Sequence, residues 1–459
     1  MALEAKFVIF LSSVFLLHFL LWFRPSEPYL VPYMQHRANL TTQQAYQDVF
    51  PIWTYCLLPA SFLQALVAEM ISYRVALVAA AIFAFTESVV TWTSKSLIQF
   101  CVSEVFAALY FGSIFLILAT LFRSVPVEYF RVVSGFSLVA SLVANVLSAT
   151  LGQMLRQHDY PLELLFMITV CTSASTIALA IVAAVTTPTI KTDMNRFSIW
   201  KDVRGMVRTL WCVYRDWQGL VWSLYIISTT VGMTLATTYY IPFLLSIDKQ
   251  SSNYLGTVSA ISYSVAAGVV VSVALSEFIY RRCRARDPDN EVLSISVVDA
   301  HEQLPLTTHA VQADVSETVA PGQVGMTLMT FGIVGILACG ACVLLYLMAF
   351  SENWVFAAGF YIGSHALLQL AAPPANAQLG KRVLGFGRQR YAAILGINSF
   401  LTQVVQLIVQ TVIGKHVTGL FIPAQFNVFA GLMGFGGLIV CIGFITTCCR
   451  RRSVYNALS

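Results

Sequence analysis

The chain is poor in charged residues. Of its 459 residues, 11% are Asp, Glu, Lys or Arg and 58% are hydrophobic, whereas soluble proteins carry about 25% charged residues. So few charges cannot cover a water-soluble surface, and the composition therefore indicates an integral membrane protein. Nucleic-acid-binding modules, cytosolic enzymes and disulfide-stapled secreted domains are excluded as first interpretations, and we expect no nucleic-acid partner.

The sequence also lacks the patterns of catalytic and metal sites. It contains no phosphate-binding loop, no Gly-x-Ser-x-Gly and no His/Glu spacing suited to a metal, and its long apolar runs hold no aspartate. Cys339 and Cys342 lie inside an apolar run, where we interpret them as reduced packing residues and not as a redox pair. We therefore expect no enzyme activity, no cofactor and no metal site.

Long hydrophobic runs are what the chain has in abundance. About 20 apolar residues in a helix cross a bilayer core, and twelve runs approach or exceed that length. The first has no small-x-small cleavage motif after it, so we interpret it as a span and not as a signal peptide. The runs are Phe7–Phe23, Pro51–Ile71, Val75–Thr93, Leu97–Phe122, Val132–Leu155, Leu162–Val185, Gly219–Ile241, Tyr254–Ile279, Val324–Phe350, Trp354–Leu379, Tyr391–Ile413 and Gln425–Cys448.

A polar, basic stretch divides these runs into six and six. Two six-helix halves with a basic connection are the ground plan of the major facilitator superfamily, in which half-repeats rock about a central site. The sequence thus predicts an all-α integral membrane protein of that type. We expect a first half over 1–187, a cytoplasmic connecting loop over 188–216, a second half over 217–450 with a cytoplasmic loop over 281–323, and a cytoplasmic tail over 451–459.

The basic residues are distributed asymmetrically. With the N-terminus inside, 21 of the 27 Lys and Arg fall on inner segments, which predicts that both termini are cytoplasmic. The sequon Asn39-Leu-Thr41 then falls on an outer loop, where a glycan can be attached. The polar segment 284–322 is expected to be a disordered cytoplasmic loop, with a regulatory role left open.

Ionisable residues within spans are functional candidates, because burying a charge in lipid is costly. Glu27 follows the first span in Arg24-Pro-Ser-Glu-Pro28, where the two prolines interrupt regular helix. A carboxylate near aromatic faces suits a flat organic cation. The other ionisable candidates are Glu69, Arg74, Glu87, Glu104 and His365.

Structural roles remain open for each of these residues. Glu27 can pair with Arg24, Glu87 can form a structural ion pair, and His365 can be a packed polar residue. Trp53 near an outer interface can be an ordinary belt aromatic. For Glu69 and Arg74 we favour an inner gate over a ligand site.

Several motifs share the pattern of one known family. They are Arg24-Pro-Ser-Glu-Pro-Tyr-Leu-Val-Pro-Tyr33, Asn39-Leu-Thr41, Phe50-Pro-Ile-Trp-Thr-Tyr55 and Arg390-Tyr-Ala-Ala-Ile-Leu-Gly-Ile-Asn-Ser399. Over most of both halves the chain resembles the reduced folate carrier and thiamine transporter family of facilitators.

This resemblance implies a substrate site. Glu27, Phe50 and Trp53 correspond to substrate positions of the family, and Ser26 and Gln406 look like its thiamine branch. The other cavity walls would be formed by Tyr110, Ser113, Thr238, Tyr239, His365 and Gln406.

The resemblance favours an alternating-access carrier for thiamine in the plasma membrane, either monomeric or a weak homodimer. The glutamate that thiamine transporters carry in helix four is replaced here by Gly112 or Ser113. Folate or pyridoxine therefore remain alternative substrates, and a vitamin sensor without transport is an alternative from another functional class.

Overall fold

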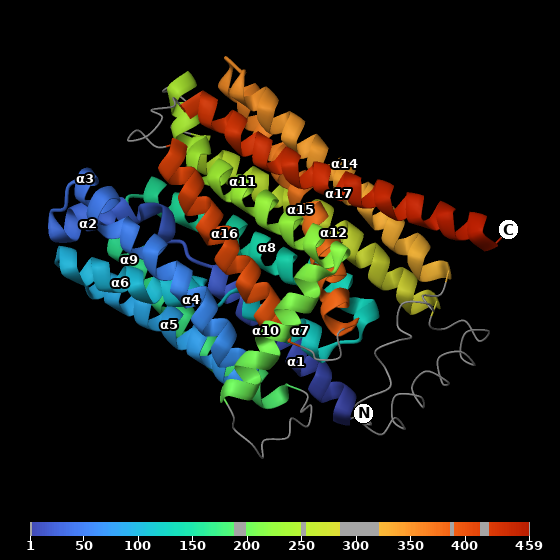
Figure 1. The fold of residues 1–459 in the computed structure, drawn as a ribbon. Coiled ribbons are helices and arrows are strands. Elements are labelled where there is room, and N and C mark those ends of the chain that lie inside the picture. Colours follow the sequence, from blue (N-terminus) through green and yellow to red (C-terminus); the bar gives the residue numbers. More distant parts are fainter. Residues whose placement is uncertain are drawn as a thin grey trace.

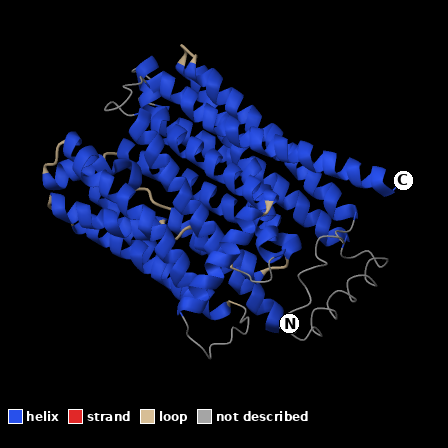
Figure 2. Ribbon diagram, in the orientation of Figure 1, coloured by secondary structure: helices blue, strands red, loops and turns tan. Residues whose placement is uncertain are grey.

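The computed structural model describes residues 2–187, 199–248, 254–284, 321–385, 390–413 and 422–458. These residues are helical apart from short turns, and no strand occurs among them (Figure 2). By length and composition, twelve helical stretches can cross a membrane. The prediction of an all-α membrane protein with twelve spans is confirmed.

The first six spans extend from Ala5 to Thr186. Two of them are interrupted. Helices α1 (Ala2–Trp22) and α2 (Leu30–Ala38) form the first span, and α6 (Leu97–Phe111) and α7 (Phe115–Ser124) form the fourth. A short helix and a π-helical turn, α3 (Thr42–Gln44) and Ala45–Val49, lead into the second span. The helices are α1 (Ala2–Trp22), α2 (Leu30–Ala38), α4 (Phe50–Met70), α5 (Tyr73–Thr93), α6 (Leu97–Phe111), α7 (Phe115–Ser124), α8 (Phe130–Gln157) and α9 (Leu162–Thr186).

The last six spans are single helices. They are α11 (Trp217–Ile247), α12 (Leu255–Arg284), α14 (Pro321–Ala349), α15 (Trp354–Gly385), α16 (Tyr391–Ile413) and α17 (Ile422–Leu458). Helix α17 continues to Leu458, so most of the segment expected as a tail is helical. The expected loop over 284–322 falls almost wholly outside the described residues.

The connecting segment 188–216, expected as a loop, contains helix α10 (Ile199–Arg215). Its apolar residues recur at helical spacing, and Met206, Thr209 and Val213 are buried against the bundle. The composition of this segment is polar, which concealed the periodicity.

Each group of six helices packs mainly within itself. In the first group α1 lies against α8 and α9, and α5 lies against α6 and α9; in the second, α17 lies against α11 and α14. The two groups meet where α8 packs on α12 and α4 packs on α16 (Figure 1). Small residues allow these crossings to be close, since a Cβ on Gly135 would lie 2.9 Å from Ala274 Cβ.

Both chain ends lie at the same end of the bundle, with the C-terminus at the right and the N-terminus at the lower right of Figure 1. We call this end the termini face and the other end the opposite face. Helix α10 also lies at the termini face, where it contacts α4, α11, α15 and α16.

The chain passes from α10 into α11 through a tight junction. Asp216 caps α11, its Oδ2 accepting a hydrogen bond from the backbone N–H of Gly219 at 3.0 Å. A Cβ on Gly219 would lie 2.3 Å from the carbonyl oxygen of Val213. This close approach requires glycine, because the obstructing atom belongs to the backbone.

Replacing Gly219 by Ala should therefore lower the thermal stability of the purified protein by several degrees, since overpacking costs about 1–3 kcal/mol. Gly268→Ala is the matched control, because a Cβ there meets no atom within 4 Å. Thermal unfolding in detergent measures both variants. Equal unfolding temperatures would contradict this account of the junction.

Candidate functional site

The candidate site forms where the first span is broken. Pro25 and Pro28 cannot continue the hydrogen-bond ladder, so α1 ends at Trp22 and a 3-10 turn over Glu27–Tyr29 leads into α2. The backbone N–H of Arg24 donates to Ser148 Oγ on α8 at 2.8 Å. A Cβ on the neighbouring Gly152 would lie 3.0 Å from Pro25 O. The break is therefore held tightly against α8.

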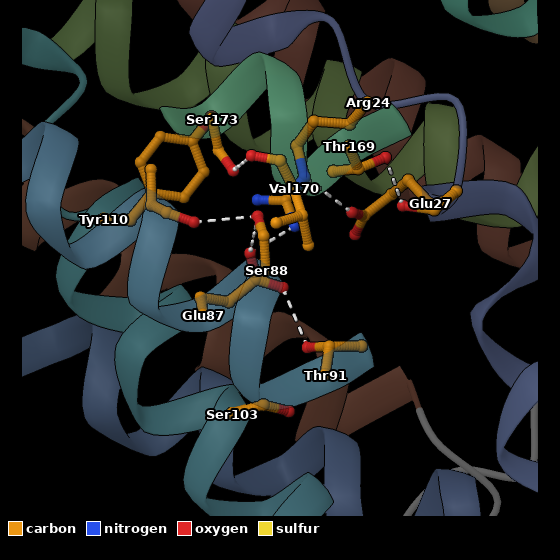
Figure 3. Close-up of polar contacts among 12 residues, drawn as sticks. Arg24, Glu27, Glu87, Ser88, Thr91, Ser103, Tyr110, Thr169, Val170 and Ser173 are labelled. Atoms are coloured by element: carbon orange, nitrogen blue, oxygen red, sulfur yellow. Dashed lines mark hydrogen bonds and ion pairs between the residues drawn. The ribbon is translucent and has the colours of Figure 1, made fainter. Parts of the chain in front are cut away.

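The side chain of Arg24 bridges two carboxylates (Figure 3). Its Nη2 donates to Glu87 Oε2 on α5, and its Nε lies 3.2 Å from Glu27 Oε2. The Arg24 and Glu87 side chains are 11% and 8% exposed, whereas Glu27 is 50% exposed. Glu87 thus serves as the buried counter-ion, and Glu27 keeps an accessible carboxylate.

Hydroxyl groups complete the surroundings of Glu87. Ser88 Oγ and Thr91 Oγ1 each donate to its carboxylate at 3.2 Å. A buried carboxylate needs such donors in addition to its ion-pair partner, because each unsatisfied oxygen carries a desolvation cost. Glu87 is therefore the residue that Arg24 requires in order to lie in the membrane.

Aromatic side chains lie around the Arg24 guanidinium. Its central carbon lies 5.4 Å from the ring centroid of Tyr110 and 5.9 Å from that of Phe111. Trp53 meets Phe111 edge to face at 5.9 Å, and the Tyr110 hydroxyl donates to the Leu21 carbonyl. Cation–ring attraction adds to the ion pairs. Helix α6 therefore contacts Arg24 directly, and Trp53 of α4 supports this contact through Phe111.

A small cavity adjoins these groups, with room for about one water molecule. It is lined by Arg24, Ser26, Glu27, Leu30, Glu87, Ser88, Thr91, Phe166 and Thr169. Two carboxylates and one guanidinium give this lining a formal charge of −1 when all are ionised. Glu104, buried on α6, interacts electrostatically with both carboxylates. The arrangement therefore favours a cation over an anion.

The structure brings together part of the predicted site. Glu27 and Tyr110 both contact Arg24, Trp53 joins them through Phe111, and Ser113 lies at the interruption between α6 and α7, its hydroxyl donating to Tyr110 O at 2.5 Å. Phe50 instead packs with a separate cluster that includes Tyr33 and Phe100.

The predicted residues of the second half lie apart from this cluster, on α11, α15 and α16. His365 is buried, with Nδ1 2.7 Å from Ser262 Oγ and Nε2 2.9 Å from Gln369 Nε2. Both ring nitrogens are thus already hydrogen-bonded, as expected for a packed polar residue. Thr238 donates to its own helix at Thr234 O, Tyr239 packs 5.7 Å from Phe429, and Gln406 is buried on α16.

The predicted gate residues lie near the termini face. Tyr73 OH donates to Glu69 Oε1 at 2.6 Å and accepts the N–H of Ala392 at 3.0 Å. The N–H of Ala393 donates to Glu69 Oε1 at 3.2 Å. The first backbone N–H groups of a helix have no hydrogen-bond acceptor within that helix. Glu69 and Tyr73 of the first half supply these acceptors to α16 of the second half. We call these four residues the termini-face latch.

Arg74 makes a different contact. Its Nη2 donates to the Thr187 carbonyl at the end of α9, 2.8 Å away. A cation is favourable at a helix C-terminus. The two predicted gate residues therefore act on different helices: Glu69 reaches the second half, whereas this contact of Arg74 lies within the first.

Aromatic rings close the same end of the bundle. Phe122 stacks on Phe130 at 4.4 Å, and Tyr391 meets both rings edge to face at 6.0 and 5.8 Å. A Cβ on Gly380 of α15 would lie 2.9 Å from the Phe122 ring. Since these residues come from both halves, the latch lies beside a tightly packed interface.

The match to a protein-family model falls on the first half of the chain. Residues 6–194 match the family model described as Reduced folate carrier. This part of the chain is therefore similar to the reduced folate carrier family. The family resemblance identified from the Arg24–Tyr33 signature is thereby confirmed.

Similar proteins carry the names of folate-like transporters and of thiamine transporters. A folate-like transporter of Dictyostelium discoideum is 23% identical over 93% of this chain and 65% of its own length. Thiamine transporter 2 of Macaca fascicularis is 26% identical over 29% of this chain and 27% of its own. Folate-like transporter 2 of Caenorhabditis elegans is 30% identical over 29% and 31%. The chain thus matches less than two thirds of the length of each of these relatives.

Solved structures confirm the fold. The human organic anion transporter MFSD10 and the major facilitator superfamily transporter FucP, the latter in an outward conformation, each align with a TM-score of 0.62 at 14% identity. Each alignment covers 95% of this chain and 99% of the other chain. The predicted major facilitator superfamily architecture is correct.

The family signature provides the helix break, but its central residue was not recognised from the sequence. The sequence suggests Arg24 as a partner of Glu27 and a structural ion pair for Glu87, but it does not show that Arg24 pairs with Glu87. A signal was present, because Glu87 is the one acidic residue in the run Val75–Thr93 and requires a nearby cation.

Glu87→Gln should destabilise the protein more than Glu27→Gln does. Removing the buried partner of Arg24 costs about 3 kcal/mol, whereas a half-exposed ion pair contributes about 1 kcal/mol or less. Thermal unfolding of the two variants in detergent gives the comparison. If Glu27→Gln were as destabilising, the assignment of Glu87 as the buried counter-ion would be wrong.

Breaking the latch should expose the start of α16. In Tyr73→Phe the amide of Ala392 loses its acceptor, and in Glu69→Ala the amide of Ala393 loses its acceptor. Hydrogen exchange at the amide concerned should therefore accelerate up to about tenfold in each variant. Peptide-level exchange mass spectrometry over the first turn of α16 measures this. Tyr254→Phe, which alters a ring stacked on Trp354, is the control, and unchanged exchange in both latch variants would refute the contact.

Proposed function

We propose that the protein is a secondary transporter that takes up a water-soluble vitamin, thiamine, by alternating access. The observation that carries this proposal is the excess of carboxylates at the break in the first span. Glu27 retains an accessible carboxylate while Arg24 is neutralised by Glu87. A cationic substrate can therefore bind Glu27 without displacing the buried pair.

Electrostatics supports a cation over a folate dianion. The guanidinium beside the cavity is already shared between two carboxylates, and an anion there would meet repulsion in a medium of low dielectric constant. An interior-negative membrane potential would also draw a monovalent cation inward by about 2.3 kcal/mol per 100 mV. Relatives named thiamine transporters agree with this choice.

For the substrate contacts, we propose that Glu27 faces the cationic ring while Trp53 and Phe50 supply aromatic surface. Tyr110 and Ser113 would form the adjoining wall of the first half. The second-half wall would include Thr238, Tyr239, Gln406 and His365. His365 can contact substrate only by exchanging one of its present hydrogen bonds, those to Ser262 and Gln369.

For the transport cycle, we propose that the latch closes the cytoplasmic side. The distribution of basic residues supports a cytoplasmic position for the termini face. A carboxylate at a helix N-terminus stabilises by about 0.3–1 kcal/mol, rising to about 2 kcal/mol when partly buried. A contact of that size can open during rocking of the halves. We propose the plasma membrane as the location of this carrier.

The sequon agrees with this orientation. Asn39 ends α2 in a left-handed conformation, with φ of 53°, and its side chain is exposed. Helix α2 belongs to the part of the first span farthest from the N-terminus, so Asn39 lies toward the opposite face. We propose that it carries a glycan on the extracellular side.

Folate transport is the second candidate, and the length of the match to the Dictyostelium folate-like transporter favours it. It would require cationic groups on the substrate path. Arg24 could serve only if Glu87 or Glu27 were protonated or moved. The competition of substrates in one assay separates the two candidates.

Uptake of labelled thiamine into cells that lack their own carrier tests the proposal, with unlabelled thiamine, folate and pyridoxine as competitors. Glu27→Gln should abolish saturable uptake while surface protein is retained, because the accessible carboxylate is lost. Glu352→Gln, at an exposed acidic position before α15, is the control. Normal thiamine uptake in Glu27→Gln would reject the assigned site, and uptake blocked by folate would favour the second candidate.

A further inference from the structure

Helix α10 is built into the termini face. Tyr214 OH donates to Asn398 Oδ1 on α16 at 2.6 Å, and Asn398 Nδ2 donates to Ser223 Oγ on α11 at 3.3 Å. Met206 and Val213 are buried on the same side of the helix. One face of α10 is therefore committed to contacts with the spans.

The other face of α10 is exposed and has two kinds of residue. Val207 and Trp211 are 58% and 67% exposed, and Arg204, Arg208 and Arg215 are also exposed. At about 100° per residue, these five positions fall within an arc of about 100°. The apolar pair occupies one edge of this arc and the arginines the other. We call these five residues the α10 basic face.

The charge on this face is unbalanced. Residues 203–215 contain no Asp or Glu, and among the described residues no ion pair involves these three arginines. A large exposed indole beside free guanidinium groups is typical of a helix that lies at a membrane surface. Arginine also forms paired hydrogen bonds with phosphate oxygens.

The position of the helix decides which partner fits. One residue, Asp216, separates α10 from Trp217, where the seventh span begins. The α10 basic face is thus next to the layer of lipid headgroups. Trp211 can enter the boundary with the acyl chains while the arginines contact phosphates, which is the usual interfacial position of tryptophan.

We propose that the α10 basic face binds anionic phospholipid headgroups of the leaflet at the termini face. This site is independent of the substrate site and of the identity of the vitamin. Because Tyr214 ties α10 to α16, whose first turn belongs to the latch, lipid bound there would stabilise the closed termini face. The proposal therefore also assigns the connecting segment a role in anchoring the bundle.

The test uses the full-length protein in detergent, titrated with phosphatidylserine or phosphatidylcholine in mixed micelles. Phosphatidylserine should raise the unfolding temperature and phosphatidylcholine should not. Each basic residue near an anionic surface strengthens association about fivefold. The triple variant R204Q/R208Q/R215Q should therefore need a much higher mole fraction of phosphatidylserine, up to about a hundredfold, and R204K/R208K/R215K should retain most of the effect.

The matched control is K95Q/R156Q, which removes exposed basic residues away from the termini face. It should keep the phosphatidylserine response of the unaltered protein. Raising the NaCl concentration should weaken that response through screening. An equal response in the protein and the triple variant, or the same stabilisation by inorganic phosphate alone, would overturn the proposal.

Discussion

A guanidinium that lies within the membrane must be neutralised nearby, and this requirement organises the first half of the molecule. Arg24 lies at the broken first span, and its charge is met by Glu87 from α5 and Glu27 from the turn that follows. Five further contacts hold the group: the Ser148 hydroxyl at the backbone, the hydroxyls of Ser88 and Thr91 at the carboxylate, and the rings of Tyr110 and Phe111. The break, the carboxylates and the rings form one interdependent unit, since the loss of any buried charge leaves another without a partner.

The two carboxylates at Arg24 differ because their surroundings differ. Glu87 is enclosed and receives hydroxyl donors, so its role is to hold the cation. Glu27 is half exposed, so water or a substrate can reach it. Arg24 thus pairs with two carboxylates of different kinds, the buried Glu87 and the accessible Glu27. This separation is what a binding site for a cation needs in a medium of low dielectric constant.

Much of the architecture followed from the sequence, because hydrophobic length and the separators between runs determine the number of spans. The twelve spans were accessible in this way. The prolines at 25 and 28 predicted the interruption, and Glu27 and Glu69 were candidates because they are ionisable residues in or beside spans. The partners of these residues were not accessible. Pairing of Arg24 with Glu87, or of Glu69 with the amides of Ala392 and Ala393, depends on which helices touch, and periodicity in a single sequence does not encode that. Helix α10 was missed because its polar composition outweighed its helical spacing.

The latch joins main-chain atoms of the second half to side-chain atoms of the first half. On the second half it uses main-chain N–H groups of Ala392 and Ala393, which every residue except proline provides. On the first half it uses particular side chains, Glu69 and Tyr73. Sequence drift at positions 392 and 393 can therefore change the shape of the interface without removing a donor. Over evolutionary time, the strength of this contact between the two halves would be adjusted mainly through the side chains of the first half.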